Sequence, residues 1–237
     1  MNKYNLMLPA CKLYILSTTS ASVGDSGEPF GSIYNLERAC PFCGTAAQLV
    51  GPIRSIGLSK AKKDFFDTLG GDLMLSEKLK QALEDAGLMS NCLYPVHDTK
   101  GNVLPLYHIN PTLTLPKAHK DSTGLKKADQ CKNCKRDGHF NEAIIGSLEN
   151  DIPTYVAPLQ LNYDNVDADF LNSSDAFNTW EHFGISRLKK EGNYVVHYAR
   201  PLIIVNERVK AVFEKLKIKH TEFEEVTLRL PADSFFN

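Results

Sequence analysis

Four of the six cysteines stand in two Cys-x-x-Cys pairs, Cys40 and Cys43 in "CPFCG" and Cys131 and Cys134 in "CKNCK". This spacing lets two thiolates reach one tetrahedral ion. Two such pairs supply the four ligands of a structural zinc site, with Zn–S distances of about 2.3 Å. We therefore predict one shared site, with Zn²⁺ as a structural cofactor and these four cysteines as its ligands.

The residues that follow each pair differ. Gly44 follows the first pair, and glycine there allows a positive φ that turns backbone amides toward the sulfur atoms. Lys135 takes this place after the second pair, and Gly138 comes three residues later. The sequence therefore leaves the geometry of the second turn open. His139 is a possible substitute ligand, although a surface histidine in a turn is the simpler interpretation.

Cysteine pairs have other uses, which the sequence leaves open. Two disulfides are disfavoured in a reducing cytosol. The first pair, Cys-Pro-Phe-Cys, looks like a glutaredoxin-type redox site, which needs a strand before it and a helix after it, whereas Gly44 breaks the chain there. Cys11 and Cys92 belong to neither pair, and we expect them to be small buried apolar residues.

An internal repeat indicates which elements position the cysteines. Residues 73–96 and 203–226 align in register without a gap. Each copy begins with a short apolar strand that ends at Ser76 or Asn206, both good N-cap residues. A helix follows, whose apolar residues three and four apart mark one buried face, and a second strand comes after it. The apolar positions are Leu79, Ala82, Leu83 and Ala86 in the first copy and Val209, Val212, Phe213 and Leu216 in the second.

A second pair of similar sequences, which we call the echo, precedes the two copies: "DFFDT" at residues 64–68 and "DAFNT" at residues 175–179. We predict an α+β fold in which two pseudo-repeated strand–helix–strand halves are joined around a zinc-ribbon-like site with four cysteine ligands. Residues 1–237 would form one compact unit. Its first half, residues 36–135, contains both cysteine pairs and the first repeat, and its second half, residues 136–237, contains the second repeat.

Signatures of catalysis are missing from the sequence. It has no phosphate-binding glycine-rich loop, no His-Glu-x-x-His and no Gly-x-Ser-x-Gly. Glu77 and Glu207 recur in the first turn of each predicted helix, where a carboxylate favours the helix dipole whatever the protein does. We therefore expect no enzymatic activity. Trp180, the single tryptophan, is expected to be a packing residue.

The overall composition is that of an ordinary soluble protein. Lys and Arg number 27 against 28 Asp and Glu, so the net charge of −1 gives no global field for nucleic acid or an anionic membrane. No apolar run approaches the roughly 18 residues of a membrane span, and the apolar residues 6–10 are too few for the core of a signal peptide. We expect a cytoplasmic protein.

One segment is locally basic. Residues 117–136 carry seven Lys or Arg and two Asp, and they lead into the second cysteine pair. Zinc ribbons often bind nucleic acid, but this segment has no aromatic residue on which a base could stack. A solvated loop that offsets the charge of the zinc-bound thiolates is the simpler interpretation. A zinc-ribbon nucleic-acid-binding protein or regulator is the alternative function.

The chain resembles a known protein family in four places. These are the second cysteine pair and the stretches "ERACPFCG", "SDAFNTWEHFG" and "LIIVNERVKAVFEKLKIKHTEFEEV". The chain resembles the double-CxxCG motif family of bacterial proteins over residues 36–226. That family is associated with polymorphic toxin systems, in which its members act as immunity proteins. Cys40, Cys43, Cys131 and Cys134 take the places of the family's cysteine pairs, and Lys135 departs from its glycine.

The resemblance implies a function without catalysis. The protein would hold a cognate toxin inactive, and the toxin would be its partner. Such a protein needs only a rigid surface that is complementary to one target. If the toxin is a basic nuclease, the acidic residues 162–170 and 220–226 are candidate contacts, although ordinary solvated faces explain them as well.

Overall fold

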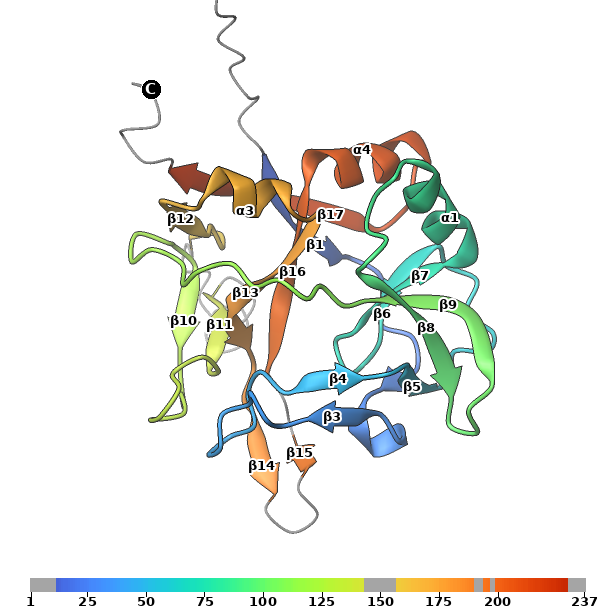
Figure 1. Ribbon diagram of the computed structural model, residues 1–237, viewed down its shortest axis with the longest axis horizontal. Helices are drawn as coiled ribbons and strands as arrows, with labels where there is room; N and C mark the ends of the chain where they lie inside the picture. The colour runs from blue at the N-terminus through green and yellow to red at the C-terminus, as the bar shows by residue number, and fades with distance from the viewer. Residues whose placement is uncertain (1–11, 143–156, 190–193, 197–198, 230–237) are drawn as a thin grey trace, which may run out of the picture.

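Two curled sheets, one of six strands and one of five, form most of the fold (Figure 1). The computed structural model describes residues 12–142, 157–189, 194–196 and 199–229. The first sheet has the order β2 (Asp25–Ser26), β5 (Ile53–Ile56), β8 (Leu93–Asp98), β9 (Val103–Ile109), β7 (Leu73–Ser76) and β6 (Phe65–Asp67). The second has the order β12 (Asn162–Asp164), β17 (Thr221–Arg229), β1 (Leu13–Thr18), β16 (Arg200–Asn206) and β13 (Ala176–Phe183).

Two-stranded ladders and helices complete the described part of the chain. The ladders are β3 (Ile33–Asn35) with β4 (Gln48–Val50), β10 (Leu125–Lys127) with β11 (His139–Asn141), and β14 (Arg187–Lys189) with β15 (Tyr194–Val196). The helices are α1 (Glu77–Asp85), α3 (Ala168–Asn172), α4 (Glu207–Lys215) and the short 3-10 turn η1 (Glu28–Phe30). None of the helices in the described residues is long and apolar enough to cross a membrane.

Each sheet contains a strand–helix–strand unit, β7–α1–β8 in the first and β16–α4–β17 in the second. The predicted N-caps are confirmed: Ser76 Oγ accepts a hydrogen bond from the Leu79 amide (3.3 Å), and Asn206 Oδ1 accepts one from the Val209 amide (3.1 Å). Both caps satisfy amides that a helix start leaves without a partner in the helix. The chain therefore enters both helices by the same local chemistry.

Loss of the Asn206 cap gives a first prediction. Asn206→Ala is expected to lower the free energy of unfolding by about 1–2 kcal/mol, because the cap is lost. The Asn206 amide also donates to Asp175 Oδ1 (2.8 Å), and that hydrogen bond is lost as well. Urea unfolding measures the effect. Asn172→Ala, at an exposed position in α3, is the control and should change the free energy of unfolding by less than about 0.5 kcal/mol. Equal losses of stability in the two variants would contradict the assignment of Asn206 as the N-cap of α4.

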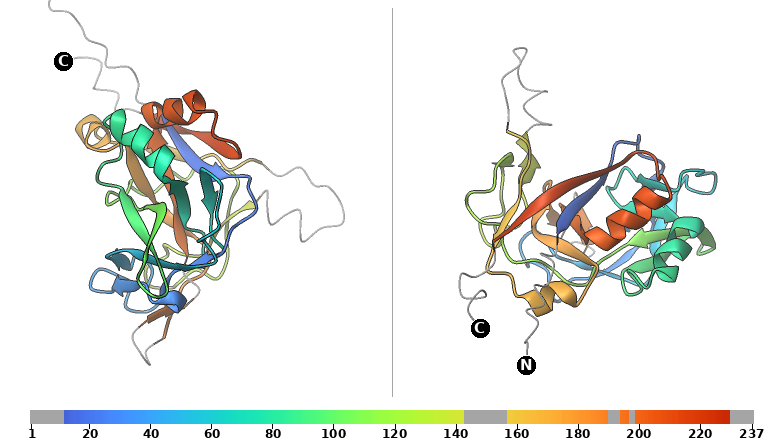
Figure 2. Two further views of the ribbon diagram at one scale, coloured as in Figure 1. Left: turned by 90° about the vertical axis from the view of Figure 1, so that its right-hand side faces the viewer. Right: turned by 90° about the horizontal axis from the view of Figure 1, so that it is seen from above.

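The main core lies where the two units meet. Leu79 of α1 and Val209 of α4 belong to one buried cluster, and the two helices lie side by side in both views (Figure 2). Because strand side chains alternate between faces, Tyr14 of β1 joins this cluster, whereas Leu13 and Ile15 face a second core on the far side of the five-stranded sheet. Both sheets thus share one core, and each sheet also buries its other face in a cluster of its own.

The two sheets pair their strands in a similar way. β8 pairs in parallel with β5, and β17 pairs in parallel with β12. β7 and β16 each pair antiparallel with the strand of the "DFFDT" or "DAFNT" echo. In each sheet one further strand lies between the two strands of the unit, and its position in the sequence differs. β9, which follows β8 directly, lies between β8 and β7, whereas β1, from the N-terminal part of the chain, lies between β17 and β16. β1 precedes residue 36, so it belongs to neither predicted half.

Candidate metal centre

The two cysteine pairs lie in the connections of two small hairpins. Cys40 and Cys43 lie between β3 and β4, and Cys131 and Cys134 lie between β10 and β11. A hairpin holds both ends of its loop at a fixed separation, so each pair is presented by a closed loop. The structure brings all four predicted ligands together.

The sulfur geometry fits a tetrahedral ion. The four Sγ atoms lie within 4.8 Å of one another. Cys40 Sγ is 3.9 Å from Cys131 Sγ, and Cys43 Sγ is 3.6 Å from Cys134 Sγ. Metal–sulfur bonds of about 2.3 Å in a tetrahedron place neighbouring sulfur atoms about 3.8 Å apart. The four cysteines are therefore close enough to hold a metal ion, and none of them forms a disulfide.

Both loops have the same backbone turn. The Gly44 amide donates to the Cys40 carbonyl (2.8 Å) with φ of 79° at Gly44. In the second loop the Lys135 amide donates to the Cys131 carbonyl (3.0 Å) with φ of 54° at Lys135. The sequence left this second turn open because a lysine stands where the first loop has glycine. Lys135 adopts the left-handed conformation at an expected cost of roughly 1–2 kcal/mol.

This strain gives a second prediction. Lys135→Gly is expected to raise the free energy of unfolding by about 0.5–1 kcal/mol, because glycine adopts the left-handed turn without the steric penalty, although it gains entropy in the unfolded chain. Lys132→Gly is the matched control, since Lys132 is exposed in the same loop and has no positive φ. Lys132→Gly should lower the free energy of unfolding, measured in urea. A lower free energy of unfolding in both variants would show that Lys135 is not strained.

The ligands differ in their electrostatic surroundings. Burial opposes ionisation of Cys40, but the amides of Phe42 and Cys43 and the side chain of Asn133 outweigh it and lower the pKa of Cys40 to about 7. Burial raises the pKa of Cys43, even though its sulfur lies 3.0 Å from Thr45 Oγ1. Amides that point at sulfur are the groups that stabilise metal-bound thiolates.

His139 does not belong to the cluster, and its interpretation as a surface histidine is wrong. It begins β11 with 1% of its surface exposed. Its Nδ1 lies 3.1 Å from the Arg136 carbonyl oxygen and its Nε2 lies 3.2 Å from Gln130 Nε2. Burial lowers the pKa of His139. The ring is a buried, hydrogen-bonded residue behind the second cysteine loop.

The cluster joins parts of the chain that belong to different sheets. Before the first hairpin, Ser32 Oγ accepts from the amide of Arg54 in β5 (2.8 Å). In the second loop Asp137 accepts from the Cys131 amide (2.8 Å) and from the amide of Ser186, just after β13 (3.4 Å). A bound ion would therefore cross-link the six-stranded sheet to the five-stranded sheet.

The structure also bears on the remaining cysteine predictions. Cys92 is buried in the main core, as expected, and Cys11 lies outside the described residues. The first pair is followed by the hairpin strand β4, where a glutaredoxin-type site would need a helix. The geometry thus favours metal binding over redox chemistry at Cys40 and Cys43.

Comparison with known proteins adds no family. No family model and no curated protein matches this chain. The resemblance to double-CxxCG proteins therefore stays a prediction, and the candidate metal centre rests on its own geometry.

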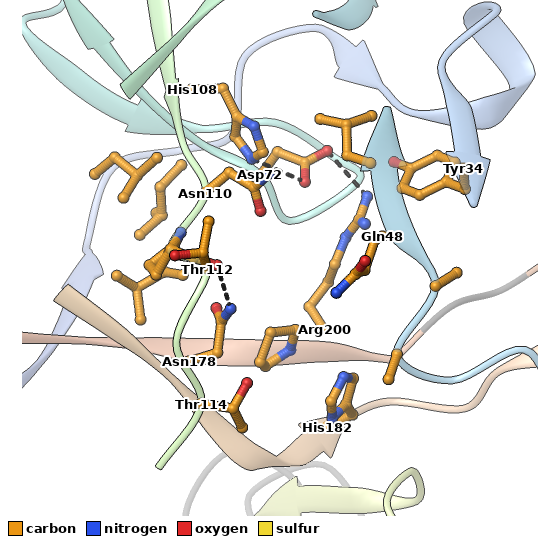
Figure 3. Close-up of a pocket in the computed structure, with 18 of the residues that line it drawn as sticks. Tyr34, Gln48, Asp72, His108, Asn110, Thr112, Thr114, Asn178, His182 and Arg200 are labelled. Atoms are coloured by element: carbon orange, nitrogen blue, oxygen red, sulfur yellow. Dashed lines mark hydrogen bonds and ion pairs between the residues drawn. The ribbon is translucent and has the colours of Figure 1, made fainter. Parts of the chain in front are cut away.

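Sequence reasoning missed a polar cavity of about 440 Å³ that both sheets and both cysteine hairpins line (Figure 3). Asp72 precedes β7, His108 lies in β9, and Arg200 begins β16. In the sequence, a charged residue lies directly before or at the start of the apolar first strand of each strand–helix–strand unit, and this is the one local sign of the network. Pairing between them could not be inferred, because Asp72 and Arg200 are 128 residues apart.

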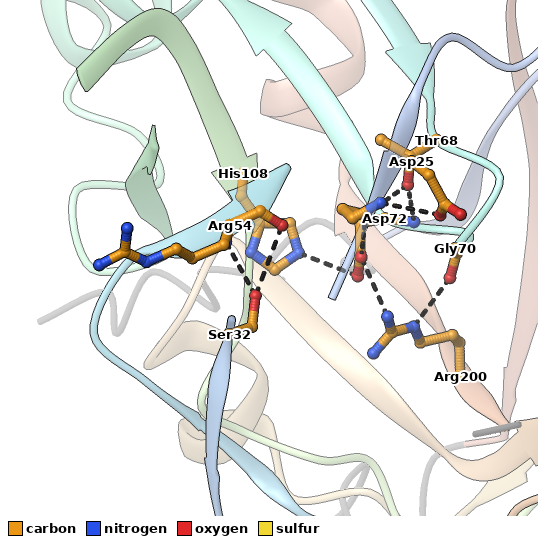
Figure 4. A network of polar contacts seen from close by, with 9 residues as sticks. Asp25, Ser32, Arg54, Thr68, Gly70, Asp72, His108 and Arg200 are labelled. Atoms are coloured by element: carbon orange, nitrogen blue, oxygen red, sulfur yellow. Dashed lines mark hydrogen bonds and ion pairs between the residues drawn. The ribbon is translucent and has the colours of Figure 1, made fainter. Parts of the chain in front are cut away.

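These three residues form a polar network around the buried Asp72 (Figure 4). Arg200 Nη2 lies 2.9 Å from Asp72 Oδ2, and Arg200 Nε donates to the Gly70 carbonyl (3.0 Å). Ser26 Oγ also donates to Asp72 (2.6 Å), and His108 Nε2 lies 3.5 Å from it. Burial alone would raise the pKa of Asp72, but Arg200, His108 and Ser26 hold it at about 2. The network is a second link between the sheets.

Proposed function

We propose that the four cysteines hold one structural zinc ion and that the protein is a non-catalytic immunity protein that neutralises a cognate toxin in the cytoplasm. The observation that carries the zinc assignment is the convergence of four sulfur atoms from two hairpins. Four thiolates in a tetrahedron suit zinc or iron, and a site whose four positions are all filled by protein leaves none for substrate. The resemblance of the sequence to double-CxxCG proteins supports the immunity function.

The two units support a duplicated architecture. We propose that β7–α1–β8 and β16–α4–β17 are two copies of one strand–helix–strand unit, joined by a zinc-ribbon-like pair of hairpins. Equivalent positions of the repeat, such as Leu79 and Val209 or Leu83 and Phe213, pack into the same core. The similar pairing of β8 with β5 and of β17 with β12 is a further support.

A structural zinc ion can be tested by metal analysis. Protein purified without added zinc should contain one zinc per chain, and its four cluster thiols should react only after denaturation with a chelator. Iron in place of zinc would show as a coloured protein. Protein that folds without metal and reacts at once at Cys40 would contradict the assignment.

Exposed apolar side chains make the first hairpin a candidate toxin contact. Ile33 and Val50 are paired across β3 and β4, so they share a face, and they are 67% and 51% exposed. Phe42, in the cysteine loop of this hairpin, is 70% exposed. Large apolar anchors of this kind dominate many protein interfaces. The acidic segment 162–170 fits this role less well, because Asp164 lies beside His119 and Arg229, and Asp167 caps α3.

The immunity function predicts that a neighbouring gene encodes the toxin, and that toxin would provide the test. Co-expression should protect cells from that toxin, and the purified proteins should form a complex. Phe42→Ser, checked for retained zinc, should weaken the complex by about 30-fold or more. Leu69→Ser, at a 75% exposed position between β6 and β7, is the control. An adjacent toxin that neither binds nor is neutralised would contradict the proposal.

Nucleic-acid binding is the second candidate function, and one contact favours it. The basic segment has no aromatic residue of its own, but Trp180 of β13 lies beside it. Lys117 Nζ lies 5.1 Å from the centre of the Trp180 ring, and the Arg136 guanidinium lies 5.5 Å from it. Binding to single-stranded DNA or RNA that weakens with salt and with Lys117→Gln would support this alternative.

A further inference from the structure

The cavity between the sheets has the features of a ligand site. We propose that it binds a small organic anion that has an apolar or aromatic body and one carboxylate or phosphate group. This inference does not depend on the immunity function. A volume of about 440 Å³ lies within the range of small-molecule sites, which often lie where two structural units meet.

The walls of the cavity offer an apolar surface for the body of such a molecule. Leu49 of β4, Ile109 of β9 and Ile203 of β16 line it, so the first hairpin and both sheets contribute. Tyr34 of β3 adds an aromatic ring, and Asn178 of β13 adds an amide (Figure 3). Apolar side chains that alternate with polar groups, which fix the orientation of the bound molecule, are a common arrangement in sites for small organic ligands.

The charges on the lining favour an anion. Arg38, Arg136 and Arg200 line the cavity, and Asp72 is the one acidic residue on the described lining. Asp72 is paired with Arg200 and buried, so these two charges offset each other. Two arginines therefore remain as excess positive charge.

Arg136 also serves the metal centre. It follows the second cysteine pair, and four thiolates on a divalent ion carry a net charge of −2 that Arg136 would partly offset. Arg38 is different, since it is exposed and makes no ion pair within the described part of the chain. Even if Arg136 is assigned to the thiolates, Arg38 keeps a positive charge on the lining of the cavity, where a carboxylate or phosphate could pair with it.

Three probes with a common ring test the proposal on the full chain. Calorimetric titration at constant ionic strength would use benzoate, phenyl phosphate and neutral benzamide. At least one of the two anions should bind with a Kd of about 1 mM or below, and benzamide at least tenfold more weakly. The tighter of the two anions identifies the preferred group as carboxylate or phosphate.

Two arginine variants locate the binding. Arg38→Gln should weaken the tighter anion by about fivefold or more, whereas Arg208→Gln, at an exposed position in α4 outside the cavity, should leave its Kd unchanged. The proposal is overturned if neither anion binds with a Kd of about 1 mM or below, if benzamide binds less than tenfold more weakly than the tighter anion, or if Arg38→Gln weakens that anion by less than about fivefold.

Discussion

Replacement of Cys43 by serine is expected to abolish stoichiometric zinc binding and to lower the free energy of unfolding by about 4 kcal/mol or more. The physical reason is the long loop that the ion closes, since Cys43 and Cys134 are 91 residues apart. A covalent cross-link over such a loop is worth roughly 4–5 kcal/mol through the entropy of the unfolded chain. At about 2–4 °C per kcal/mol for a chain of this size, the melting temperature should fall by about 8–16 °C.

Cys92→Ser is the matched control for this prediction. It makes the same chemical change at a buried cysteine that lies outside the cluster. This variant should keep its zinc and remain sensitive to chelator, with a smaller loss of stability from its buried polar group. The structural role of the metal would be contradicted by two results together. The Cys43→Ser protein would have the same melting temperature as the wild type, and a chelator would not lower the melting temperature of the wild type.

Features set by local chemistry could be predicted from the sequence. Ser76 and Asn206 identify the helix starts, because the N-cap interaction reaches only three residues along the chain. Each Cys-x-x-Cys spacing identifies half of a metal site for the same reason, since each pair sits in one loop. The meeting of the two pairs could be predicted only because a tetrahedral ion needs four ligands. Lys135 was harder to interpret, because the turn favours glycine and the surrounding loop holds a lysine in the same conformation.

Features set by long-range pairing could not be predicted. The insertion of β1 between β16 and β17 joins strands from opposite ends of the chain, and no local pattern specifies that register. His139 shows the same limit, because its burial depends on the packing of β11 against the end of β13. The cavity and its charges likewise arise only when the two sheets meet.

Arg200→Met is expected to have the second largest effect, a loss of about 3–5 kcal/mol at neutral pH. Asp72 is 5% exposed, so removal of the arginine would leave a buried carboxylate without its principal counter-charge. Arg208→Met is the control, because its side chain is 68% exposed and lies 3.9 Å from Asp175; its loss should stay below about 1 kcal/mol. Urea unfolding of the two variants measures the difference.

The pH dependence of the stability distinguishes the contribution of the Asp72–Arg200 ion pair from a contribution of Arg200 through packing alone. In the wild type the pKa of Asp72 is lowered from 3.8 to about 2, which contributes stability that is fully present above pH 4 and is lost as the pH falls toward 2. This contribution is about 2 kcal/mol. In Arg200→Met the burial of Asp72 remains while its strongest favourable interaction is gone, so its pKa should rise above the usual value and protonation should relieve the strain.

The stability gap between wild type and Arg200→Met should therefore narrow as the pH falls from 7 toward 4. Protonation of the cluster thiols is common to both proteins and cancels in the difference. Asp72→Asn combined with Arg200→Met should be more stable at pH 7 than Arg200→Met alone, because the buried charge is removed. Arg200 would stabilise the protein by packing and not through Asp72 if two results were found. The difference in free energy of unfolding between wild type and Arg200→Met would stay constant with pH, and the double variant would be no more stable than Arg200→Met.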